Sequence, residues 1–179
     1  MKDNFEGNIY HHIISCAGLL IELCSNDLAL LKLDYIKNKK INNSTLIPDP
    51  IERAISFLED YFTGTRNRIE ISFYKTGDPI LKKNSGKLYL DMSEYTDKEI
   101  EIYRNLLNVK ASKTISYSEL SSISGITDGA RFAGNCMAQN RFPVIIPCHR
   151  VIKKDGSMGN YTGGVDIKEF LLKHEENFK

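Results

Sequence analysis

The chain has no long uninterrupted apolar run and carries little net charge for its 179 residues. Its most apolar N-terminal stretch, residues 11–24, is broken by polar groups and is too short to span a bilayer, so no membrane association is expected. Residues 1–10 show no basic segment leading into an apolar one, so we expect no secretion leader and a cytoplasmic protein. A net charge of +1 by itself gives little reason to expect a nucleic-acid partner.

Cysteine is scarce, and the four cysteines show neither a metal-site pattern nor a disulfide framework. Without export, four cysteines are expected to be free thiols. Cys148 and His149 have no second ligand pair downstream, and the histidines and cysteines within residues 11–24 fit no standard zinc spacing. A Gly-rich nucleotide-binding loop is also missing. We therefore expect neither a metal nor a cofactor.

Apolar residues at 41% and charged residues at 26% are ordinary for a folded globular protein. The length accommodates one large domain or two small ones. Residues 13–24 and 28–36 predict two strands of an antiparallel hairpin, and residues 68–75 predict a third strand. Residues 49–64 have helical periodicity, with a proline near the start and a glycine at the end, and predict a helix between them.

Residues 76–95 contain several structure breakers and no helical period, so the boundary between two subdomains is expected here. We predict an α+β fold. Its N-terminal α/β subdomain, residues 1–90, has a small antiparallel sheet, and its C-terminal subdomain, residues 91–179, is mostly helical.

The C-terminal subdomain contains a predicted helix-turn-helix, formed by residues 116–125 and 128–140 with a glycine-containing turn between them. A longer helix, residues 96–109, precedes it and opens with the capping-box pair Thr96 and Glu99. A final helix is expected at residues 165–178. Since many small helical domains contain such a helix pair, the motif alone is weak evidence for nucleic-acid binding.

Positive charge is concentrated between residues 128 and 154, where five cations and one anion give a net charge of +4. The remainder carries −3, because the whole chain is +1. The segment is either a solvated basic face or a contact surface for an anionic partner.

The sequence IPCHRVI, residues 146–152, places a cysteine beside a histidine and an arginine. Cys148 fits four roles: a packed inert thiol, a metal ligand, a disulfide partner of Cys136, or a nucleophile. The missing ligand pair disfavours the metal, and a reducing compartment disfavours the disulfide. Cationic neighbours are expected to lower the thiol pKa, which favours the nucleophile over the inert thiol. Because adjacent side chains of an extended segment diverge, His149 is expected to act through a water molecule.

From about residue 96 to residue 176 the chain resembles the O6-alkylguanine-DNA alkyltransferases, a family of direct-reversal DNA repair proteins. The resemblance rests on ISYSEL, ARFAGNCMAQN, IPCHRVI, GNYTGG and a final K…LL…E, which occur in the family's order and roughly its spacing. It implies a ribonuclease-H-like N-terminal sheet. It also implies that a base carrying an O6-alkyl group is flipped from double-stranded DNA and that the alkyl group passes irreversibly to Cys148, once per molecule. O4-alkylthymine is a further candidate substrate, no cofactor is required, and a monomer is expected.

The resemblance also assigns roles by position. Cys148 matches the acceptor, His149 the base that takes its proton through water, and Glu175 the carboxylate that orients this base. Asn140 matches the asparagine that braces the helix-turn-helix against the active-site segment. Groups that assist the departing guanine are Tyr161 and Lys168. The resemblance implies that the second helix lies in the minor groove, that Tyr117 crowds a phosphate and that Arg131 fills the gap left by the flipped base. The implied DNA contacts are Tyr117, Arg131, Phe132, Met137, Arg150, Thr162 and Gly163.

Two positions depart from the family's pattern: Phe132 replaces a small residue, and Arg141 stands where proline often follows the asparagine. Three alternatives remain open: a lesion-binding protein that transfers nothing, a repair protein that also regulates transcription, and a cysteine hydrolase. Retention of Cys148, His149 and Glu175 argues against the first. The chain is too short for the additional modules of the second, and no acyl-substrate groove is indicated for the third.

Overall fold

The computed structural model describes residues 8–37, 43–65, 69–76, 78 and 86–178. The chain divides into two units, Met1–Glu94 and Tyr95–Lys179. The boundary between subdomains that we predict from the sequence, after residue 90, lies four residues before this division.

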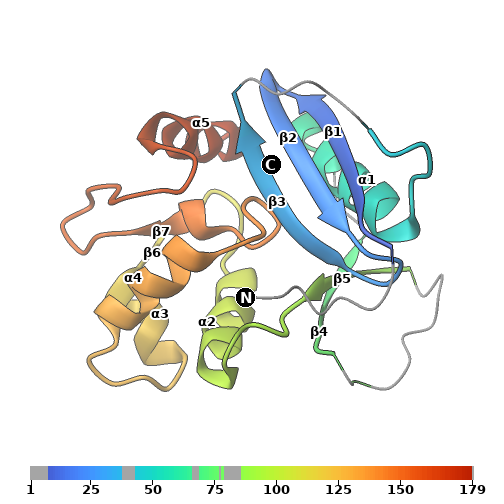
Figure 1. The fold of residues 1–179 in the computed structure, drawn as a ribbon. Coiled ribbons are helices and arrows are strands. Elements are labelled where there is room, and N and C mark those ends of the chain that lie inside the picture. The colour runs from blue at the N-terminus through green and yellow to red at the C-terminus, as the bar shows by residue number, and fades with distance from the viewer. Residues whose placement is uncertain (1–7, 38–42, 66–68, 77, 79–85, 179) are drawn as a thin grey trace. The chain divides into compact units, whose positions relative to one another are not determined.

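The first unit is built on a five-stranded sheet in the order β1-β2-β3-β5-β4 (Figure 1). β2 runs antiparallel to its two neighbours, β1 and β3, whereas β5 lies parallel to both β3 and β4. The fold is therefore α+β with a mostly antiparallel N-terminal sheet, as predicted. The strands are β1 (Tyr10–Cys16), β2 (Leu19–Ser25), β3 (Leu30–Ile36), β4 (Glu70–Tyr74) and β5 (Lys87–Asp91).

The expectation of one strand over residues 13–24 is wrong, because the chain turns back at Ala17 and Gly18. Both residues have positive φ, 50° and 80°, the conformation of a two-residue hairpin turn. The apolar pattern continues across this turn and hides it. β5 was missed because it lies in the segment taken as a boundary, while the antiparallel pairing of β2 with β3 is confirmed.

Helix α1 (Asp49–Thr63) packs on the sheet through the apolar stripe that its period predicts. Ile51, Ala54 and Leu58 are fully buried. Pro50 occupies the first turn, where its missing N–H costs no hydrogen bond, and Gly64 ends the helix in the left-handed region with φ 71°. The buried strand residues that complete this core are Ile21, Leu23, Leu33, Leu88 and Leu90.

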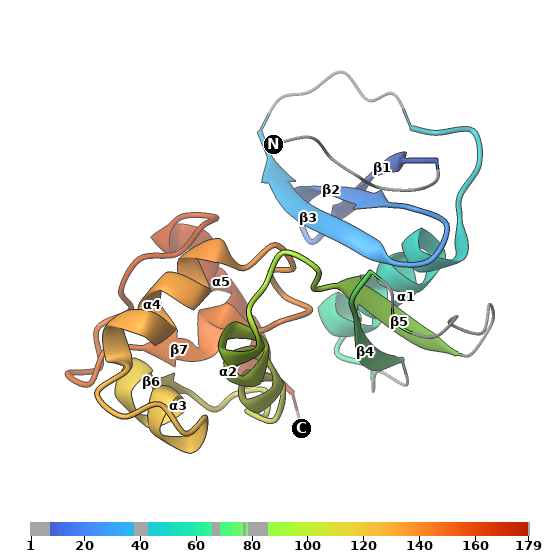
Figure 2. The ribbon, with the colours of Figure 1, turned by 60° about the horizontal axis from the view of Figure 1, so that its bottom comes forward.

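The second unit is mostly helical and contains the predicted helix-turn-helix, whose two helices α3 and α4 pack together (Figure 2). A short parallel pair, β6 with β7, joins segments that are far apart in the sequence. Among the described residues, no helix has the length and apolarity needed to cross a membrane. The elements are α2 (Asp97–Leu107), β6 (Ile115–Ser116), α3 (Tyr117–Ile123), α4 (Ala130–Gln139), the 3-10 helix η1 (Cys148–Arg150), β7 (Val151–Ile152) and α5 (Val165–Glu175).

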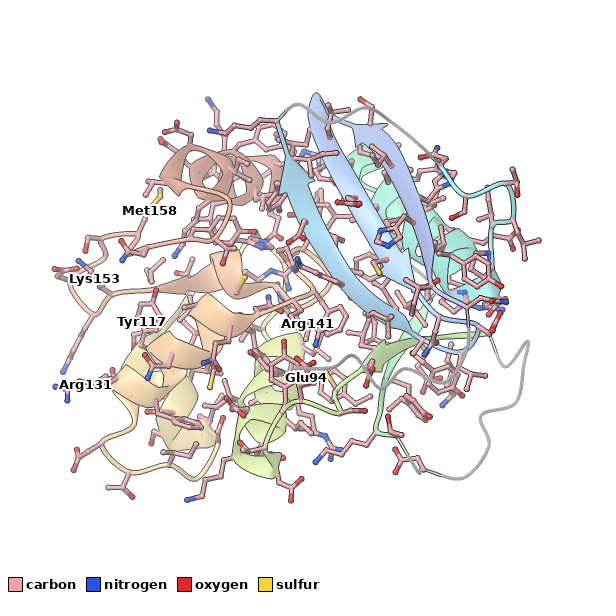
Figure 3. The ribbon with its side chains drawn as sticks, in the orientation of Figure 1. Glu94, Tyr117, Arg131, Arg141, Lys153 and Met158 are labelled. Carbon is pink, nitrogen blue, oxygen red and sulfur yellow. The ribbon has the colours of Figure 1, made fainter. Side chains whose placement is uncertain are left out.

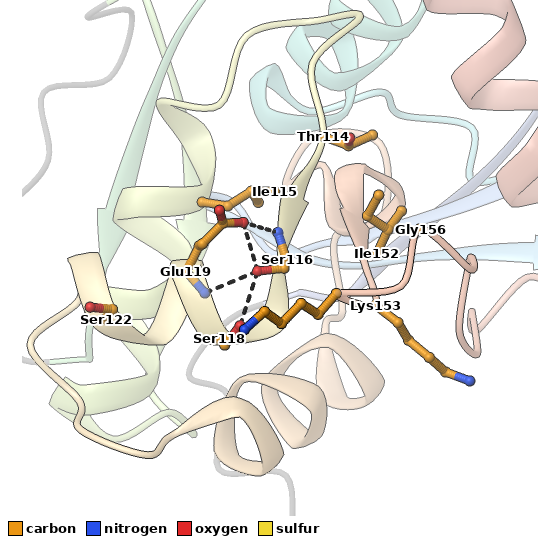
Figure 4. Close-up of a pocket in the computed structure, with 10 residues that line it drawn as sticks. Thr114, Ile115, Ser116, Ser118, Glu119, Ser122, Ile152, Lys153 and Gly156 are labelled. Carbon is orange, nitrogen blue, oxygen red and sulfur yellow. Dashed lines mark hydrogen bonds between the residues drawn. The ribbon is translucent and has the colours of Figure 1, made fainter.

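Capping boxes begin α2 and α3, as local sequence allows. Thr96 and Glu99 form the predicted box on α2. Ser116 Oγ accepts from Glu119 N at 3.2 Å and the Glu119 carboxylate accepts from Ser116 N at 2.9 Å (Figure 4). These reciprocal bonds satisfy helix-end N–H groups that have no partner within the helix.

The turn between α3 and α4 requires glycine at residue 129. A Cβ added there would lie 2.5 Å from Ile126 Cγ2 in the turn and 3.0 Å from Ser121 Cβ on α3, so any larger residue would force this turn to shift. Gly129 is the N-cap residue of α4.

Candidate functional site

Cys148 begins η1 at the end of a buried apolar segment. Residues 142–149 are all buried, and the cysteine is 3% exposed. Its N–H donates to Ile146 O at 2.8 Å, which closes a tight turn at Pro147. The thiol therefore lies in the interior of the second unit, on a rigid local scaffold.

Asn140, directly after α4, hydrogen-bonds this sulfur through its side-chain amide. Its Nδ2 donates to Cys148 Sγ at 3.0 Å and to Ile146 O at 2.9 Å, and its Oδ1 accepts from Phe142 N at 3.0 Å. Three hydrogen bonds fix the amide of a residue that is only 5% exposed. The structure thus joins the helix-turn-helix to the cysteine through Asn140.

Glu175, in the last turn of α5, binds both residues that follow the cysteine. Its Oε1 lies 2.7 Å from His149 Nε2 and accepts from Arg150 Nη2 at 2.8 Å, while Oε2 accepts from Arg150 Nε at 3.0 Å and from Ser112 N at 3.0 Å. His149 and Glu175 are fully buried. Since an ionised carboxylate only accepts hydrogen bonds, His149 must carry its proton on Nε2.

Burial raises the pKa of the Cys148 thiol to about 11, although the hydrogen bond from Asn140, the charge of Lys168 and a hydrogen bond with Tyr161 act to lower it. The expectation of a thiol pKa lowered by cationic neighbours is therefore wrong. Arg150 is bound to Glu175, and Lys153 and Lys154 are exposed. The resting cysteine is a protonated thiol and needs a base.

The adjacent groups have the protonation states that such a base requires. Burial lowers the pKa of His149, even though the hydrogen bond to Glu175 raises it, so the imidazole is neutral at pH 7. Burial would raise the pKa of Glu175, but hydrogen bonds from His149 and Arg150 outweigh it and lower this pKa to about 2. The site holds a thiol, a neutral imidazole whose Nδ1 is buried, and a carboxylate.

A cavity of about 870 Å³ opens beside Cys148 and is walled by α3, α4 and the loop after β7. Figure 3 shows Tyr117, Arg131, Lys153 and Met158 on one side of this unit. The loop approaches α3 closely, because a Cβ added at Gly159 would lie 2.9 Å from the Tyr117 hydroxyl. Of the residues expected in the site, those that line the cavity are Tyr117, Arg131, Met137, Cys148, Tyr161 and Thr162.

Three expected DNA contacts do not line the cavity. Phe132 and Gly163 are half-buried and lie off its wall. Arg150 donates to Val109 O at 2.5 Å as well as to Glu175, so its guanidinium is a structural clamp within the unit. In this structure the guanidinium of Arg150 supports Glu175.

Lys168 is not among the residues that line the cavity. Its Nζ is fully buried and donates to Val151 O at 2.6 Å and to Met158 O. Burial lowers the pKa of this amine to about 8, so it stays mostly protonated at pH 7. Lys168 ties β7 to the loop that carries Tyr161, and any assistance to a leaving group would pass through this loop.

Lys168→Met is expected to lower the free energy of unfolding by about 1–3 kcal/mol for each carbonyl that loses its donor. The reason is that methionine fills similar space but donates no hydrogen bond to Val151 O or Met158 O. Urea unfolding measures the loss, and Lys173→Met, at an exposed position of the same helix, is the control. Equal stability of the two variants would contradict the clamp.

The sequence did not predict Lys153 and Lys154 as site residues; it indicated them only as cationic neighbours of the cysteine. Both line the cavity and also a second pocket of about 440 Å³ beside α3 (Figure 4). Ser118 lines the two pockets as well. Paired lysines directly after the cysteine motif were the available signal.

All four cysteines are free thiols, so the alternative disulfide between Cys136 and Cys148 is not present. Within the described part of the chain, no group of three or more histidine, cysteine, aspartate or glutamate side chains could hold a metal ion.

Comparisons with known proteins point to one family. A family model described as "6-O-methylguanine DNA methyltransferase, DNA binding domain" matches residues 97–177. The Methanosarcina barkeri protein named methylated-DNA–protein-cysteine methyltransferase is 31% identical over 175 residues, covering 94% of this chain and 98% of that protein. The mouse protein of the same name is 32% identical over 130 residues, covering 72% of this chain. The chain spans only 56% of that mouse protein's length.

Solved structures share the fold. The Mycobacterium tuberculosis O6-methylguanine methyltransferase superimposes with a TM-score of 0.73 at 22% identity, over 96% of this chain and 95% of that chain. The Pyrococcus kodakaraensis enzyme gives a TM-score of 0.62 at 19% identity, over 94% and 99% of the two chains. Because the Methanosarcina barkeri protein is 31% identical over 94% of this chain, the chain belongs to the methylated-DNA–protein-cysteine methyltransferase family.

Proposed function

We propose that this protein repairs double-stranded DNA by moving the alkyl group of O6-alkylguanine irreversibly onto Cys148. One observation carries the proposal: a protonated thiol, with a neutral histidine and a buried carboxylate behind it, lies at the wall of a cavity formed by the helix-turn-helix. The family's name supplies the chemistry that fits this arrangement. O4-alkylthymine remains a second candidate substrate of the same transfer.

The transfer begins with removal of the thiol proton. His149 Nδ1 accepts it through a water molecule, and Glu175 stabilises the resulting imidazolium through Nε2. The thiolate attacks the saturated carbon of the alkyl group, so an S–C bond forms while the C–O6 bond breaks. Guanine leaves with that electron pair and takes up a proton. The thioether has no easy route back to a thiol, and each chain reacts once.

The Tyr161 hydroxyl is the donor that we assign to the departing guanine. It lines the cavity and hydrogen-bonds the cysteine, which places a proton donor close to the reacting atoms. No step needs a metal, a redox cofactor or a methyl-donor cofactor, because the alkylated base itself supplies the transferred group.

The target atom is inaccessible inside a base stack, so the nucleotide must be extruded into the cavity. A volume of about 870 Å³ accommodates a nucleobase and its sugar. Arg131, exposed on the first turn of α4, fills the gap in the stack, and Tyr117 crowds the neighbouring phosphate. Phe132, Met137, Thr162 and Gly163 complete the proposed contacts, with Phe132 as an apolar wedge. Lys153 and Lys154 supply phosphate contacts, so affinity should fall with salt.

The proposal is tested by intact-mass spectrometry after incubation with a duplex that contains one O6-methylguanine. We expect the mass of one methyl group per chain, saturating at that level and mapped to Cys148 after digestion. The same duplex with unmodified guanine is the control. Binding to the lesion duplex without any gain in mass would replace repair by lesion sensing.

Arg131→Ala is expected to slow transfer from the duplex about tenfold or more. Extrusion of a base costs a few kcal/mol, and each 1.4 kcal/mol is a factor of ten. Transfer from the free base O6-benzylguanine should be unchanged, because no extrusion is needed. Single-turnover rates with both substrates measure the difference, with Lys113→Ala, an exposed residue off the cavity wall, as the control. Equal slowing with both substrates would assign Arg131 to the chemical step instead.

A further inference from the structure

The hydroxyl of Tyr95 lies between the two peptide groups that flank Asn140. It donates to Gln139 O at 2.9 Å and accepts from Arg141 N at 3.2 Å. Tyr95 is 7% exposed and precedes α2, so a distant segment holds the chain on both sides of Asn140.

Helix α4 does not hold this turn by itself. The last four carbonyls of a helix have no donor within the helix. Asn140 has left the helical region with ψ 115°, and its N–H reaches Met137 O only at 3.5 Å. A proline after Asn140 would have restricted its backbone to an extended conformation. Arg141 imposes no such restriction, but it offers an N–H, and Tyr95 binds this N–H.

We infer that Tyr95 is a positioning residue that holds Asn140 against Cys148 Sγ. It does so in place of a proline after Asn140, a position that Arg141 occupies in this chain. The inference rests on the proposed function only in that Cys148 is taken to be the alkyl acceptor. Asn140 Nδ2 is 3.0 Å from the sulfur, and a hydrogen bond to a thiolate favours the ionised form. A small rotation of the Asn140 backbone would remove this bond.

Tyr103, on helix α2 that follows Tyr95, provides a matched comparison. Its hydroxyl donates to Cys136 O at 2.7 Å, about one turn before Asn140, and its ring packs edge-on against Tyr95 with centroids 5.2 Å apart. Both hydroxyls satisfy carbonyls of α4, but only Tyr95 binds on both sides of Asn140. Burial raises the pKa of Tyr103 far above its usual range, so this residue stays neutral and its hydroxyl can be removed without changing local charge.

The experiment compares Tyr95→Phe with Tyr103→Phe by the rate at which iodoacetamide alkylates Cys148, mapped by mass spectrometry from pH 7 to pH 10 without DNA. The other polar groups near the sulfur, which both variants retain, are Asn140, Tyr117, Tyr161 and Lys168. Tyr103 also lies near the sulfur, but its neutral hydroxyl carries no charge over this pH range. Tyr95→Phe should raise the thiol pKa by about one unit, which slows alkylation at a given pH about tenfold. Tyr103→Phe should alkylate at the wild-type rate.

A double-mutant cycle tests whether Tyr95 acts through Asn140. In an Asn140→Ala background, adding Tyr95→Phe should change the alkylation rate no further. Wild-type alkylation of Tyr95→Phe, equal slowing of both tyrosine variants, or a full Tyr95 effect without Asn140 would each overturn the inference. Alkylation by iodoacetamide requires no DNA. The test of Tyr95 can therefore be interpreted even if the protein fails to take up a methyl group from DNA.

Discussion

Replacing Cys148 by serine is expected to abolish uptake of the methyl group from O6-methylguanine DNA, with a loss of roughly a thousandfold or more in rate. A hydroxyl ionises far less readily than a thiol, and alkoxide is not formed by a neutral histidine at pH 7. The Asn140 amide can still donate to the serine oxygen, so the buried turn should persist. Intact mass after prolonged incubation measures the loss.

The same variant should bind the lesion duplex almost as tightly as the wild type, since the proposed phosphate and groove contacts are untouched. A gel-shift titration at fixed salt checks this. Cys16→Ser, which changes a half-buried thiol of the first unit, should transfer normally. Methyl uptake by the Cys148 variant would place the acceptor elsewhere and refute the proposed mechanism.

Glu175→Gln is expected to lower the free energy of unfolding at pH 7 by about 3–5 kcal/mol, the usual cost of removing one partner from a buried ion pair. Arg150 would keep its charge with only 12% of its side chain exposed. Glutamine has one acceptor oxygen where Glu175 has two, so some of the hydrogen bonds from His149, Arg150 and Ser112 would be lost. Methyl transfer should fall as well. Urea unfolding and single-turnover transfer measure the two effects. Glu176→Gln, an exposed neighbour, is the control and should change stability by less than about 0.5 kcal/mol.

The pH dependence gives this prediction a sign. The folded-state pKa of Glu175 is about 2, below the value of roughly 4.3 in an unfolded chain. Its contribution to stability is therefore complete above pH ~4.3 and is lost as the pH falls towards 2. The difference in the free energy of unfolding between the wild type and Glu175→Gln should therefore decrease as the pH falls from about 4.3 towards 2. A difference that stays constant from pH 7 to pH 3 would contradict the ionised pair.

A thiol pKa of about 11 has a consequence for selectivity. Thiolate is the reactive form towards electrophiles and oxidants. A buried protonated thiol is therefore protected from these reagents in the absence of substrate. In the proposed mechanism, Cys148 reacts when a bound alkylated base places its alkyl carbon beside the thiol, whose proton His149 accepts with the support of Glu175. The cysteine that can react only once is thereby reserved for its substrate.

Local sequence determined the features that depend on neighbours along the chain. The capping boxes at Thr96 and Ser116 follow from residue types three apart, and the helical period of residues 49–64 is enough to define the buried stripe of α1. The order of the motifs around Cys148 was enough to predict the family. Adjacent Cys148 and His149 also implied an indirect contact, which remains part of the proposed mechanism.

Tertiary structure alone decided the partners and the electrostatics. Arg150 binds Glu175, 25 residues away, and Lys168 binds carbonyls 10 and 17 residues away, so neither reaches the cavity. Local charge predicted a lowered thiol pKa at Cys148, yet burial raised it. The physical reason is that desolvation and hydrogen bonding depend on which distant segments surround a group, whereas capping and periodicity depend on residues within one turn.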